Sequence, residues 1–411
     1  MSDNHYDVIV VGGGAMGLAQ ILALTGFQRG LKVALLDRRP MVVPNDARAF
    51  AISAAVRRAF EALGVWAAMA GEAQPVQAMK ITDSGTGDIS RPQFLGFEGE
   101  VAPGEPFAHL VPNRSMTAAL LEAARARAEF IAPAEISGLE TDGPLARAKL
   151  TDGRVFSAPL IVAADGAQSA LRKMAGIETV LHDYRQVGIV TTIRHELPHE
   201  GVAMQHFRPA GPFASLPLKS GPEWGGNRSS LVWTETPEMA AELKALPPEE
   251  AAVRIEAAMG SSFGAVSVAE PLQSFPLRLQ LAKRFVGERL ALIGDAAHVV
   301  HPLAGQGLNL GMKDVAALSE TVIEAMRLGR DPGAADVLES YERWRRFDTA
   351  LMSAVTDALN RLFSNDIAPV RALRDFGLGL VDRLPPVKAA LIGRAAGLDR
   401  NSPKLLSGMP L

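Results

Sequence analysis

Residues 6–17 read YDVIVVGGGAMG, which joins an apolar run to a glycine-rich turn. The β-branched residues of this run are typical of a buried parallel strand. Gly12, Gly14 and Gly17 have the spacing GxGxxG, and apolar residues then recur at helical intervals. In such a unit the first glycine permits a tight turn, the second lets the backbone approach a pyrophosphate, and the third lets helix and strand pack closely. The stretch therefore predicts a dinucleotide-binding βαβ unit.

The next apolar run, KVALL at residues 32–36, ends at Asp37. Asp37 lies 20 residues after Gly17 (37 − 17), the spacing expected for a carboxylate that accepts from an adenosine ribose. Arg38 and Arg39 follow and suit a 2′-phosphate, but a carboxylate at the strand end repels that group. These residues favour NAD or FAD over NADP and leave the choice between the first two open.

Two distant segments also consist of an apolar run that ends in a polar turn. Residues 160–166 read LIVAADG, with Ser169 and Arg172 behind them, and residues 289–298 read RLALIGDAAH. The stretch PLAGQGLNLG at 302–311 opens another helical pattern. Because the start of a helix presents free amides and partial positive charge, this stretch suits an anionic or electron-rich ligand edge.

The composition excludes several classes of protein. The 411 residues suffice for two or three lobes, and 48% hydrophobic with 21% charged residues is typical of soluble globular proteins. The net charge of −3 offers no basic surplus for nucleic acid, and the lack of cysteine excludes disulfides, thiolate metal sites and Cys nucleophiles. The short polar start is unlike a signal peptide, and no run reaches the ~18 apolar residues of a membrane span. We expect a cytoplasmic protein, or one bound peripherally to the inner face of a membrane.

Together the motifs resemble those of the group A flavoprotein aromatic hydroxylases, whose fingerprints are GxGxxG, a DG motif followed by Ser and Arg, and a GD motif. All three occur in this order, at Gly12, Asp165 and Gly294, and the resemblance covers nearly the whole chain. It implies an α/β fold with a discontinuous doubly wound FAD-binding domain like that of p-hydroxybenzoate hydroxylase, a β-sheet substrate domain and a C-terminal helical tail. The implied domains are 1–74, 98–180 and 276–345 for FAD, 75–97 and 181–275 for substrate, and 346–411 for the helical region.

The resemblance also implies which residues hold the FAD. The glycine loop would face the pyrophosphate, Asp37 the adenosine ribose, and Asp165 the cleft shared with the nicotinamide donor. Asp295 would bind the ribityl or pyrophosphate region. Amides at 307–309 would face the isoalloxazine edge that becomes anionic on reduction, where a helix start is stabilising. The implied cofactor-binding set is Gly12, Gly14, Ala15, Met16, Gly17, Asp37, Arg38, Arg48, Arg114, Asp165, Asp295, Gly305, Gly307, Leu308 and Asn309.

A closer resemblance is to the aromatic-ring hydroxylases of ubiquinone biosynthesis. It rests on GDAAH at 294–298, GQGLNLG at 305–311, and the segments 205–218, 230–234 and 403–408. Residues 181–275 are expected to form strands, and the resemblance makes this region the roof of the substrate ring. Its five candidate pocket residues also fit plain core positions, and both interpretations stay open. These five are Gln205, Phe207, Phe213, Pro217 and Trp233.

The implied reaction is ring hydroxylation of a polyprenylated phenol or quinol in ubiquinone biosynthesis. NAD(P)H would reduce the FAD, O2 would add at flavin C4a, and the hydroperoxide would transfer oxygen to the ring, while the protein supplies orientation and excludes water. No second GxGxxG unit is present, so the donor is expected to bind transiently. No residue is assigned as a catalytic acid or base. The alternatives are a group A hydroxylase of another aromatic substrate, an FAD-dependent prenyl-chain reductase, and a structural subunit of a quinone-synthesis complex.

Two further features bear on ligands and partners. His298 and His301 form H-x-x-H without a clear third ligand, and no metal is predicted. Residues 369–397 carry five basic and two acidic side chains among apolar residues at helical spacing. This segment predicts either a tail packed on the protein body or a surface for a membrane or partner proteins. A homo-oligomer is also left open.

Overall fold

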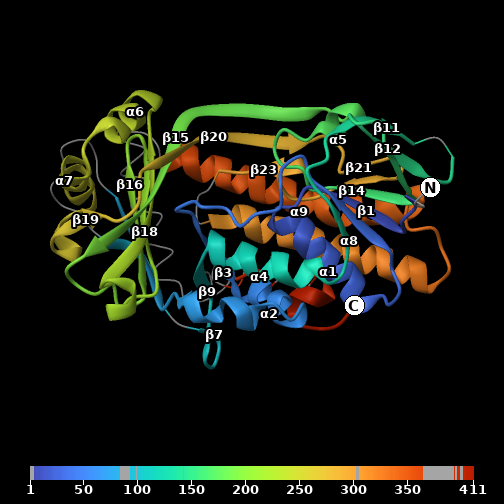
Figure 1. The fold of residues 1–411 in the computed structure, drawn as a ribbon. Coiled ribbons are helices and arrows are strands. Elements are labelled where there is room, and N and C mark those ends of the chain that lie inside the picture. Colours follow the sequence, from blue (N-terminus) through green and yellow to red (C-terminus); the bar gives the residue numbers. More distant parts are fainter. Residues whose placement is uncertain are drawn as a thin grey trace.

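Two lobes make up the part of the chain that the computed structural model describes (Figure 1). That part comprises residues 4–83, 93–98, 100–141, 143–301, 305–363, 393, 396–398 and 401–411. The first lobe is built on a parallel sheet, and the second on a larger mixed sheet.

Short apolar strands from distant parts of the chain form the parallel sheet of the first lobe. Its order is β10-β2-β1-β14-β22-β21, with only β21 antiparallel to its neighbour. The four central strands are entirely buried, as expected for strands covered on both faces. The strands are β1 (Val8–Val11), β2 (Val33–Leu36), β10 (Glu129–Ile131), β14 (Leu160–Ala163), β21 (Val286–Gly287) and β22 (Leu290–Leu292).

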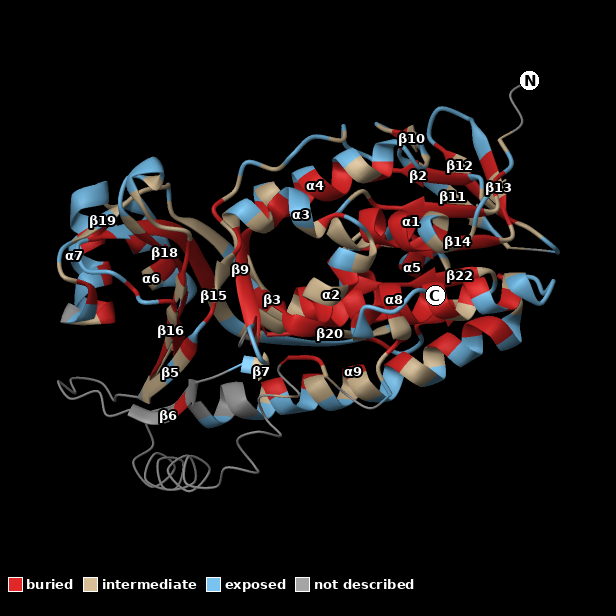
Figure 2. Cartoon of the chain, turned by 90° about the horizontal axis from the view of Figure 1, so that it is seen from below, coloured by how far each residue is buried: buried red, intermediate tan, exposed pale blue. Residues whose placement is uncertain are grey.

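Helices pack around this sheet and against one another. α1 (Ala15–Phe27) packs against α8 (Gln306–Arg327), where the buried Gln20 donates to Ser319 Oγ at 2.8 Å. α9 (Ala335–Phe363) packs on α8 and leaves its opposite side exposed (Figure 2). Other helical elements are α2 (Ala54–Ala62), α3 (Trp66–Met69), α4 (Asn113–Arg125), α5 (Ala170–Met174), η1 (Ala70–Glu72), η2 (Pro222–Trp224), η3 (Ser261–Phe263), η4 (Gly294–Ala296) and η6 (Lys404–Ser407).

A nine-stranded sheet carries the second lobe and reaches into the first. Its path is β23-β20-β15-β18-β17-β16-β5-β6, and β19 pairs with β15. The long antiparallel pair of β15 (Thr179–His195) and β20 (Gln273–Ala282) runs across both lobes (Figure 1). The other strands are β5 (Ala78–Asp83), β6 (Gln93–Glu98), β16 (Val202–Arg208), β17 (Gly211–Pro217), β18 (Asn227–Glu235), β19 (Val266–Val268) and β23 (His298–Val299).

The two faces of the nine-stranded sheet pack against different neighbours. The outer face carries Ile189, Phe213 and Trp233, which form one cluster with α6 (Pro237–Ala245) and α7 (Pro248–Met259). On the inner face, residues such as Ala203 and Leu218 cluster with side chains of a small sheet in the first lobe. The small sheets are β3 (Ala49–Ser53), β9 (Ala108–Pro112) and β4 (Gln74–Pro75); β11 (Ile136–Glu140), β12 (Ala146–Leu150) and β13 (Val155–Ala158); and β7 (Glu100–Ala102) with β8 (Glu105–Pro106).

The predicted α/β fold class is confirmed, with a doubly wound sheet assembled from separate segments and a β-sheet second lobe. The domain boundaries stay a prediction, and α9 continues without a break through residues 345–346. Near the C-terminus, Leu405 and Leu406 of η6 are buried, and η6 packs against α2 and α8. The segment 369–397 lies outside the described residues except at 393, 396 and 397. Within the described chain, no helix combines the length and apolar character that crossing a membrane requires.

Candidate functional site

In the glycine turn after β1, two glycines leave no room for a side chain and a third leaves room for one. Gly12 has φ +108°, and a Cβ there would stand 2.2 Å from the carbonyl oxygen of Ala164. A Cβ on Gly17 would stand 1.9 Å from the oxygen of Gly12. Gly14 differs, because a Cβ on it meets no heavy atom within 4 Å. Gly12 and Gly17 therefore serve the packing of strand and helix, whereas Gly14, at the N-cap of α1, borders unfilled space.

Asp37 stabilises this turn from the end of β2. Its Oδ2 accepts from the amide of Gly13 at 2.7 Å, and its Oδ1 accepts from the amide of Arg39 at 2.7 Å. The side chain is nearly buried, while Arg38 is exposed. The contact of Asp37 with a ribose stays a prediction, since both oxygens already accept backbone hydrogens and only their second lone pairs are available.

The turn after β14 contains an unsatisfied carboxylate oxygen. Asp165 Oδ2 accepts from the amide of Ala170 at 2.7 Å and from that of Leu171 at 3.3 Å. Its Oδ1 is buried and has no hydrogen-bond partner among the described residues. Arg172, from the same segment, donates to the carbonyl of Ala296 at 2.7 Å. The two sequence motifs at Asp165 and Gly294 are thus joined by one guanidinium.

The turn after β22 packs against the start of α1. Gly294 has φ +57°, and a Cβ on it would lie 2.8 Å from Met16 Cγ. A Cβ on Gly311 of α8 would lie 2.5 Å from Met16 Sδ, so Met16 fills the space between three segments. Asp295 is exposed, although protein surrounds its carboxylate closely enough that desolvation raises its pKa, against the opposing charges of His298 and Arg48. An exposed group with such surroundings lies in a recess of the protein.

The start of α8 presents free amides. Its first residue follows Gly305, which has φ +65° and no capping side chain, and a Cβ on Gly307 meets nothing within 4 Å. The first amides of a helix have no partner within the helix, so those of Gly307 and Leu308 are available to a ligand. The Asn309 side chain instead fixes β3 against α8. Its Oδ1 accepts from the amide of Ser53 at 3.1 Å, and its Nδ2 donates to the Ala51 carbonyl at 3.0 Å.

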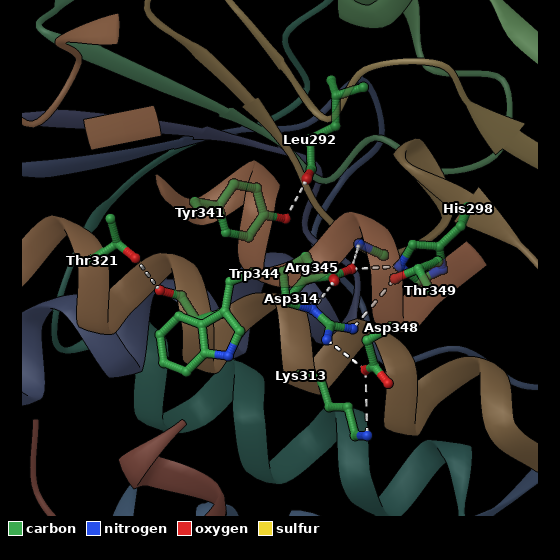
Figure 3. A network of polar contacts seen from close by, with 12 residues as sticks. Leu292, His298, Lys313, Asp314, Thr321, Tyr341, Trp344, Arg345, Asp348 and Thr349 are labelled. Atoms are coloured by element: carbon green, nitrogen blue, oxygen red, sulfur yellow. Dashed lines mark hydrogen bonds and ion pairs between the residues drawn. The ribbon is translucent and has the colours of Figure 1, made fainter. Parts of the chain in front are cut away.

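A buried ionic network behind this turn was missed by the sequence analysis (Figure 3). Asp314 of α8 accepts from the amide of Gly294 at 3.0 Å, from His298 Nε2 at 2.6 Å and from Arg345 Nε at 2.8 Å. Arg345 also donates to Asp348 at 2.7 Å. Burial alone would raise the pKa of Asp314, but His298 and Arg345 outweigh it and hold that pKa below its ordinary value. The one signal in the sequence was a carboxylate on the otherwise apolar face of a predicted helix.

The predicted arginines Arg48 and Arg114 line a pocket between the lobes. Arg48 forms a two-point ion pair with Asp46, at 3.1 and 2.9 Å, and stacks near the ring of Phe275. Arg114 lies 3.9 Å from Glu270. Arg228 of β18 lines the same pocket and was not singled out from the sequence.

The five predicted substrate residues divide between the two faces of the second sheet. Phe213 and Trp233 form an edge-to-face pair at 5.3 Å in the cluster under α6 and α7, and Pro217 shares their side of β17 by alternation. Gln205 and Phe207 alternate with Met204 of that cluster and share the inner face with Ala203. The structure therefore places only Gln205 and Phe207 on the face that turns to the first lobe; all five are buried.

These observations fit a bound dinucleotide. The carboxyl ends of β1, β14 and β22 bring together an open glycine turn, an unsatisfied Asp165 oxygen and a recessed Asp295, and α8 adds free amides. Ligands of open α/β sheets bind at this edge, where the strand order reverses. Amides and a partial positive charge suit phosphate and an anionic ring edge.

Comparison with known proteins identifies the dinucleotide as FAD. Residues 5–354 match the FAD binding domain family. The ubiquinone hydroxylase UbiL of Rhodospirillum rubrum is 42% identical, over 100% of this chain and 94% of that protein. The 3-demethoxyubiquinol 3-hydroxylase of Escherichia coli is 31% identical, over 97% of this chain and 100% of that protein.

Solved structures support the same fold at lower identity. The p-nitrophenol 4-monooxygenase PnpA of Pseudomonas putida has a TM-score of 0.76 at 20% identity, covering 95% of this chain and 98% of that one. HpxO of Klebsiella pneumoniae, crystallised with FAD, has a TM-score of 0.74 at 19% identity, covering 97% and 100%. With full-length relatives at 42% and 31% identity, the chain belongs to the FAD-binding monooxygenases of the ubiquinone hydroxylase family.

Proposed function

We propose that this FAD-dependent monooxygenase hydroxylates the aromatic ring of a polyprenylated phenol or quinol on the route to ubiquinone, with NAD(P)H and O2 as co-substrates. One observation carries the proposal: the chain aligns over its full length with a ubiquinone hydroxylase at 42% identity. The convergence of the glycine turn, Asp165, Asp295 and the start of α8 on one sheet edge supports FAD as the cofactor.

The residues of the chain would bind and orient the reactants. Bound FAD supplies the electron transfer and oxygen activation, which no amino-acid side chain provides. Gly14 and the first residues of α1 would hold its pyrophosphate, and Asp37 its adenosine ribose. The amides of Gly307 and Leu308 would stabilise negative charge on the isoalloxazine edge. Gln205 and Phe207, on the inner face of the second sheet, remain candidates for the wall that excludes water from the ring.

The test is quinone profiling in a strain that lacks the gene. The expected result is accumulation of a quinone precursor that lacks one ring hydroxyl, with ubiquinone restored by the wild-type chain. Restoration by Gly14→Val, once the purified variant is shown to lack FAD, would instead support a structural subunit of a quinone-synthesis complex. Unchanged ubiquinone in the deletion strain would contradict the proposal.

A second measurement separates hydroxylation from prenyl-chain reduction, which uses a similar cofactor lobe. Ring hydroxylation consumes NAD(P)H and O2 together and adds one oxygen to the substrate. Reduction of a prenyl chain consumes the donor without O2. Donor consumption that continues under anaerobic conditions with a saturated prenyl product would favour the reductase.

Contact with the inner face of a membrane, or with a quinone-synthesis complex, is a proposal for the basic segment 369–397. Truncation before this segment is a poor test, because it also removes the buried Leu405 and Leu406 and the ion pairs of Lys404 with Glu320 and Glu324. Charge substitution is preferable. Replacing the five basic side chains of the segment with Gln should reduce flotation with anionic liposomes, and equal flotation would count against the membrane.

A further inference from the structure

The second half of α9 carries polar residues on its buried side and apolar residues on its exposed side. The buried side has Arg345, Thr349, Ser353 and Thr356, each at most 4% exposed. The exposed side has a row of apolar residues, here called the apolar stripe, which consists of Phe347, Leu351, Ala354, Val355, Ala358 and Leu362. A surface helix of a globular protein normally turns its apolar side to the core. This half of α9 therefore directs its apolar side away from the protein body.

The first half of the same helix shows the ordinary arrangement. Val337, Leu338 and Tyr341 are buried there, while Glu339 and Arg343 are exposed. The reversal is thus confined to the second half, which lies along one edge of the molecule (Figure 2).

The polar groups on the buried side hold this half of α9 in its orientation. Arg345 pairs with Asp314 of α8, and the hydroxyl of Ser353 donates to the carbonyl of Thr349 at 2.7 Å. Thr356 donates to a carbonyl of its own helix at 3.0 Å. Turning the helix to bury the apolar stripe would separate Arg345 from Asp314, and a buried charged group without its partner costs free energy. The outward direction of the stripe therefore follows from the network behind it.

The apolar stripe is continuous and well exposed. Phe347 is 76% exposed, and Leu351, Val355 and Leu362 are 40%, 43% and 38% exposed. The stripe covers 15 steps along the helix (362 − 347), which is about 22 Å. Single exposed apolar residues are normal on soluble proteins, whereas a contiguous row of them marks an interaction surface.

The charges near the stripe indicate which kind of surface it meets. The only acids between residues 347 and 358 are Asp348 and Asp357, and both are engaged. Asp348 belongs to the buried network, and Asp357 accepts from the hydroxyl of Tyr184 at 3.0 Å. Arg343 and Arg346 are exposed just before the stripe. An apolar helix side with neighbouring arginines and no free carboxylate is suited to the interface of an anionic membrane.

The sequence that follows α9 has a similar character. The helix ends at Phe363, and residues 369–397 carry five basic and two acidic side chains among apolar residues. The apolar stripe therefore leads along the chain toward the segment whose composition suits a membrane surface.

We propose that the apolar stripe of α9 lies in the interfacial layer of an anionic membrane and holds the enzyme there peripherally, with Arg343 and Arg346 at the lipid phosphates. The inference rests on the proposed function only in the reason for this contact, since a polyprenylated ring resides in lipid. It adds a surface of the described chain to the contact proposed for residues 369–397.

The test is flotation of the FAD-loaded full-length protein with liposomes of phosphatidylcholine, alone or mixed with phosphatidylglycerol. Replacing Phe347, Leu351 and Val355 together with Gln should lower the partition coefficient into the mixed liposomes by about tenfold or more, because three apolar side chains lose their burial in lipid. Binding by the wild type should persist in high salt, since apolar contact is not screened. FAD content and melting temperature should not change, because the three side chains are exposed.

The matched control replaces three exposed apolar residues that are scattered over the molecule. Leu197, Val253 and Leu328 are 46%, 66% and 74% exposed and lie on separate elements. Their combined replacement with Gln removes a comparable exposed apolar area without touching α9. The partition coefficient of this control should stay within about twofold of the wild type, because isolated residues do not form a contact surface.

A kinetic readout separates membrane contact from catalysis. With a water-soluble quinol that lacks the prenyl chain, the triple α9 variant should hydroxylate as fast as the wild type. With a long-chain prenylated substrate presented in liposomes, its rate should fall together with its partition coefficient. A loss of rate on both substrates would contradict a role confined to the membrane.

Other outcomes would overturn the inference and assign the stripe to a different occupant. Equal flotation of the wild type and the triple variant, or no flotation of the wild type, would remove the membrane. A concentration-dependent dimer that the triple variant abolishes would assign the stripe to a second copy. The chain has no cysteine, so a disulfide formed by Leu351→Cys with Leu373→Cys in a protein that does not float would assign it to the segment 369–397. Flotation needs no substrate, so its result is independent of whether quinone profiling supports ring hydroxylation.

Discussion

The carboxylate of Asp314 on α8 receives the guanidinium of Arg345 on α9 at 2.8 Å, with both side chains buried. The same carboxylate accepts from the amide of Gly294, so one ion pair joins the helix α9 to the turn that carries Asp295 (Figure 3). A cofactor-binding turn is thereby held by a residue of α9, 51 positions further along the chain (345 − 294).

Breaking this pair should be costly. Arg345→Met leaves the carboxylate of Asp314 buried with His298 as its remaining side-chain partner, and loss of one partner from a buried pair costs about 3–5 kcal/mol. We expect that decrease in the free energy of unfolding by denaturant titration. Arg343→Met, on the exposed side of the same helix, should change it by less than about 0.5 kcal/mol. Equal effects of the two substitutions would show that the buried pair is not coupled to stability.

Buried histidines should make the protein sensitive to mild acid. Burial lowers the pKa of His301 from 6.5 to about 4, and His301 packs edge-on against Tyr184 at 5.1 Å with neither ring nitrogen bonded within the described chain. Because the unfolded chain then binds the proton more tightly, stability is full above pH 6.5 and is lost as the pH falls toward 4. His301→Phe keeps the ring and removes the titration.

We therefore expect unfolding curves of the wild type and His301→Phe to diverge on acidification. At pH 4.5 the wild type should have lost about 2.5 kcal/mol relative to the variant, compared with their difference at pH 7.5. His109, whose pKa burial also lowers to about 4, contributes equally to both proteins. Parallel stability profiles from pH 7.5 to 4.5 would disprove this role for His301.

Substitutions at two glycines of the same turn should separate folding from cofactor binding. Gly12→Ala forces a Cβ against the Ala164 carbonyl at φ +108°, and should lower the yield of folded protein and its melting temperature. Gly14→Ala introduces a methyl group into unfilled space, so the FAD-free protein should be as stable as the wild type. Its affinity for FAD should fall by at least about tenfold, measured by flavin fluorescence, because the methyl group would occupy the path of the pyrophosphate. A Gly14→Ala protein with wild-type affinity would remove this turn from the site.

The aromatic pair on the outer face of the second sheet should contribute to stability. Phe213→Ala removes a side chain that is 2% exposed and packs against Trp233, and such truncations cost about 3–5 kcal/mol. Phe207→Leu, on the inner face, is the informative comparison. It should lower the free energy of unfolding by less than about 1.5 kcal/mol. Because Phe207 is a candidate for the substrate wall, this variant should also raise KM for the aromatic substrate. Urea unfolding and steady-state kinetics on both variants measure the two effects. A substrate defect in Phe213→Ala without destabilisation would reverse this assignment.

The sequence was sufficient to predict those features whose physical cause lies within one segment of the chain. A β-branched run followed by GxGxxG specifies strand, turn and helix within a dozen residues, because the apolar periodicity and the spacing of the glycines are local properties of the chain. The same holds for the runs that end at Asp37, Asp165 and Gly294. Their order along the chain carries the resemblance to the group A hydroxylases, which implied the doubly wound sheet and the FAD, and the comparisons with known proteins confirm both.

Contacts between distant elements could not be derived in this way. Alternation along β16, β17 and β18 shows which residues share a side, but only the packing of α6 and α7 decides that Phe213 and Trp233 face away from the first lobe. The pairing of Asp314 with Arg345 depends on how α9 lies along α8. Nothing in the sequence distinguishes Arg228 from other arginines on strands; the packing of the two lobes places it in one pocket with Arg48 and Arg114. The sequence, with the family resemblance that it carries, thus determined the chain's cofactor and fold class, whereas tertiary structure decided which charges are buried and which face each lobe presents. Burial and charge compensation depend on neighbours that are remote in the chain.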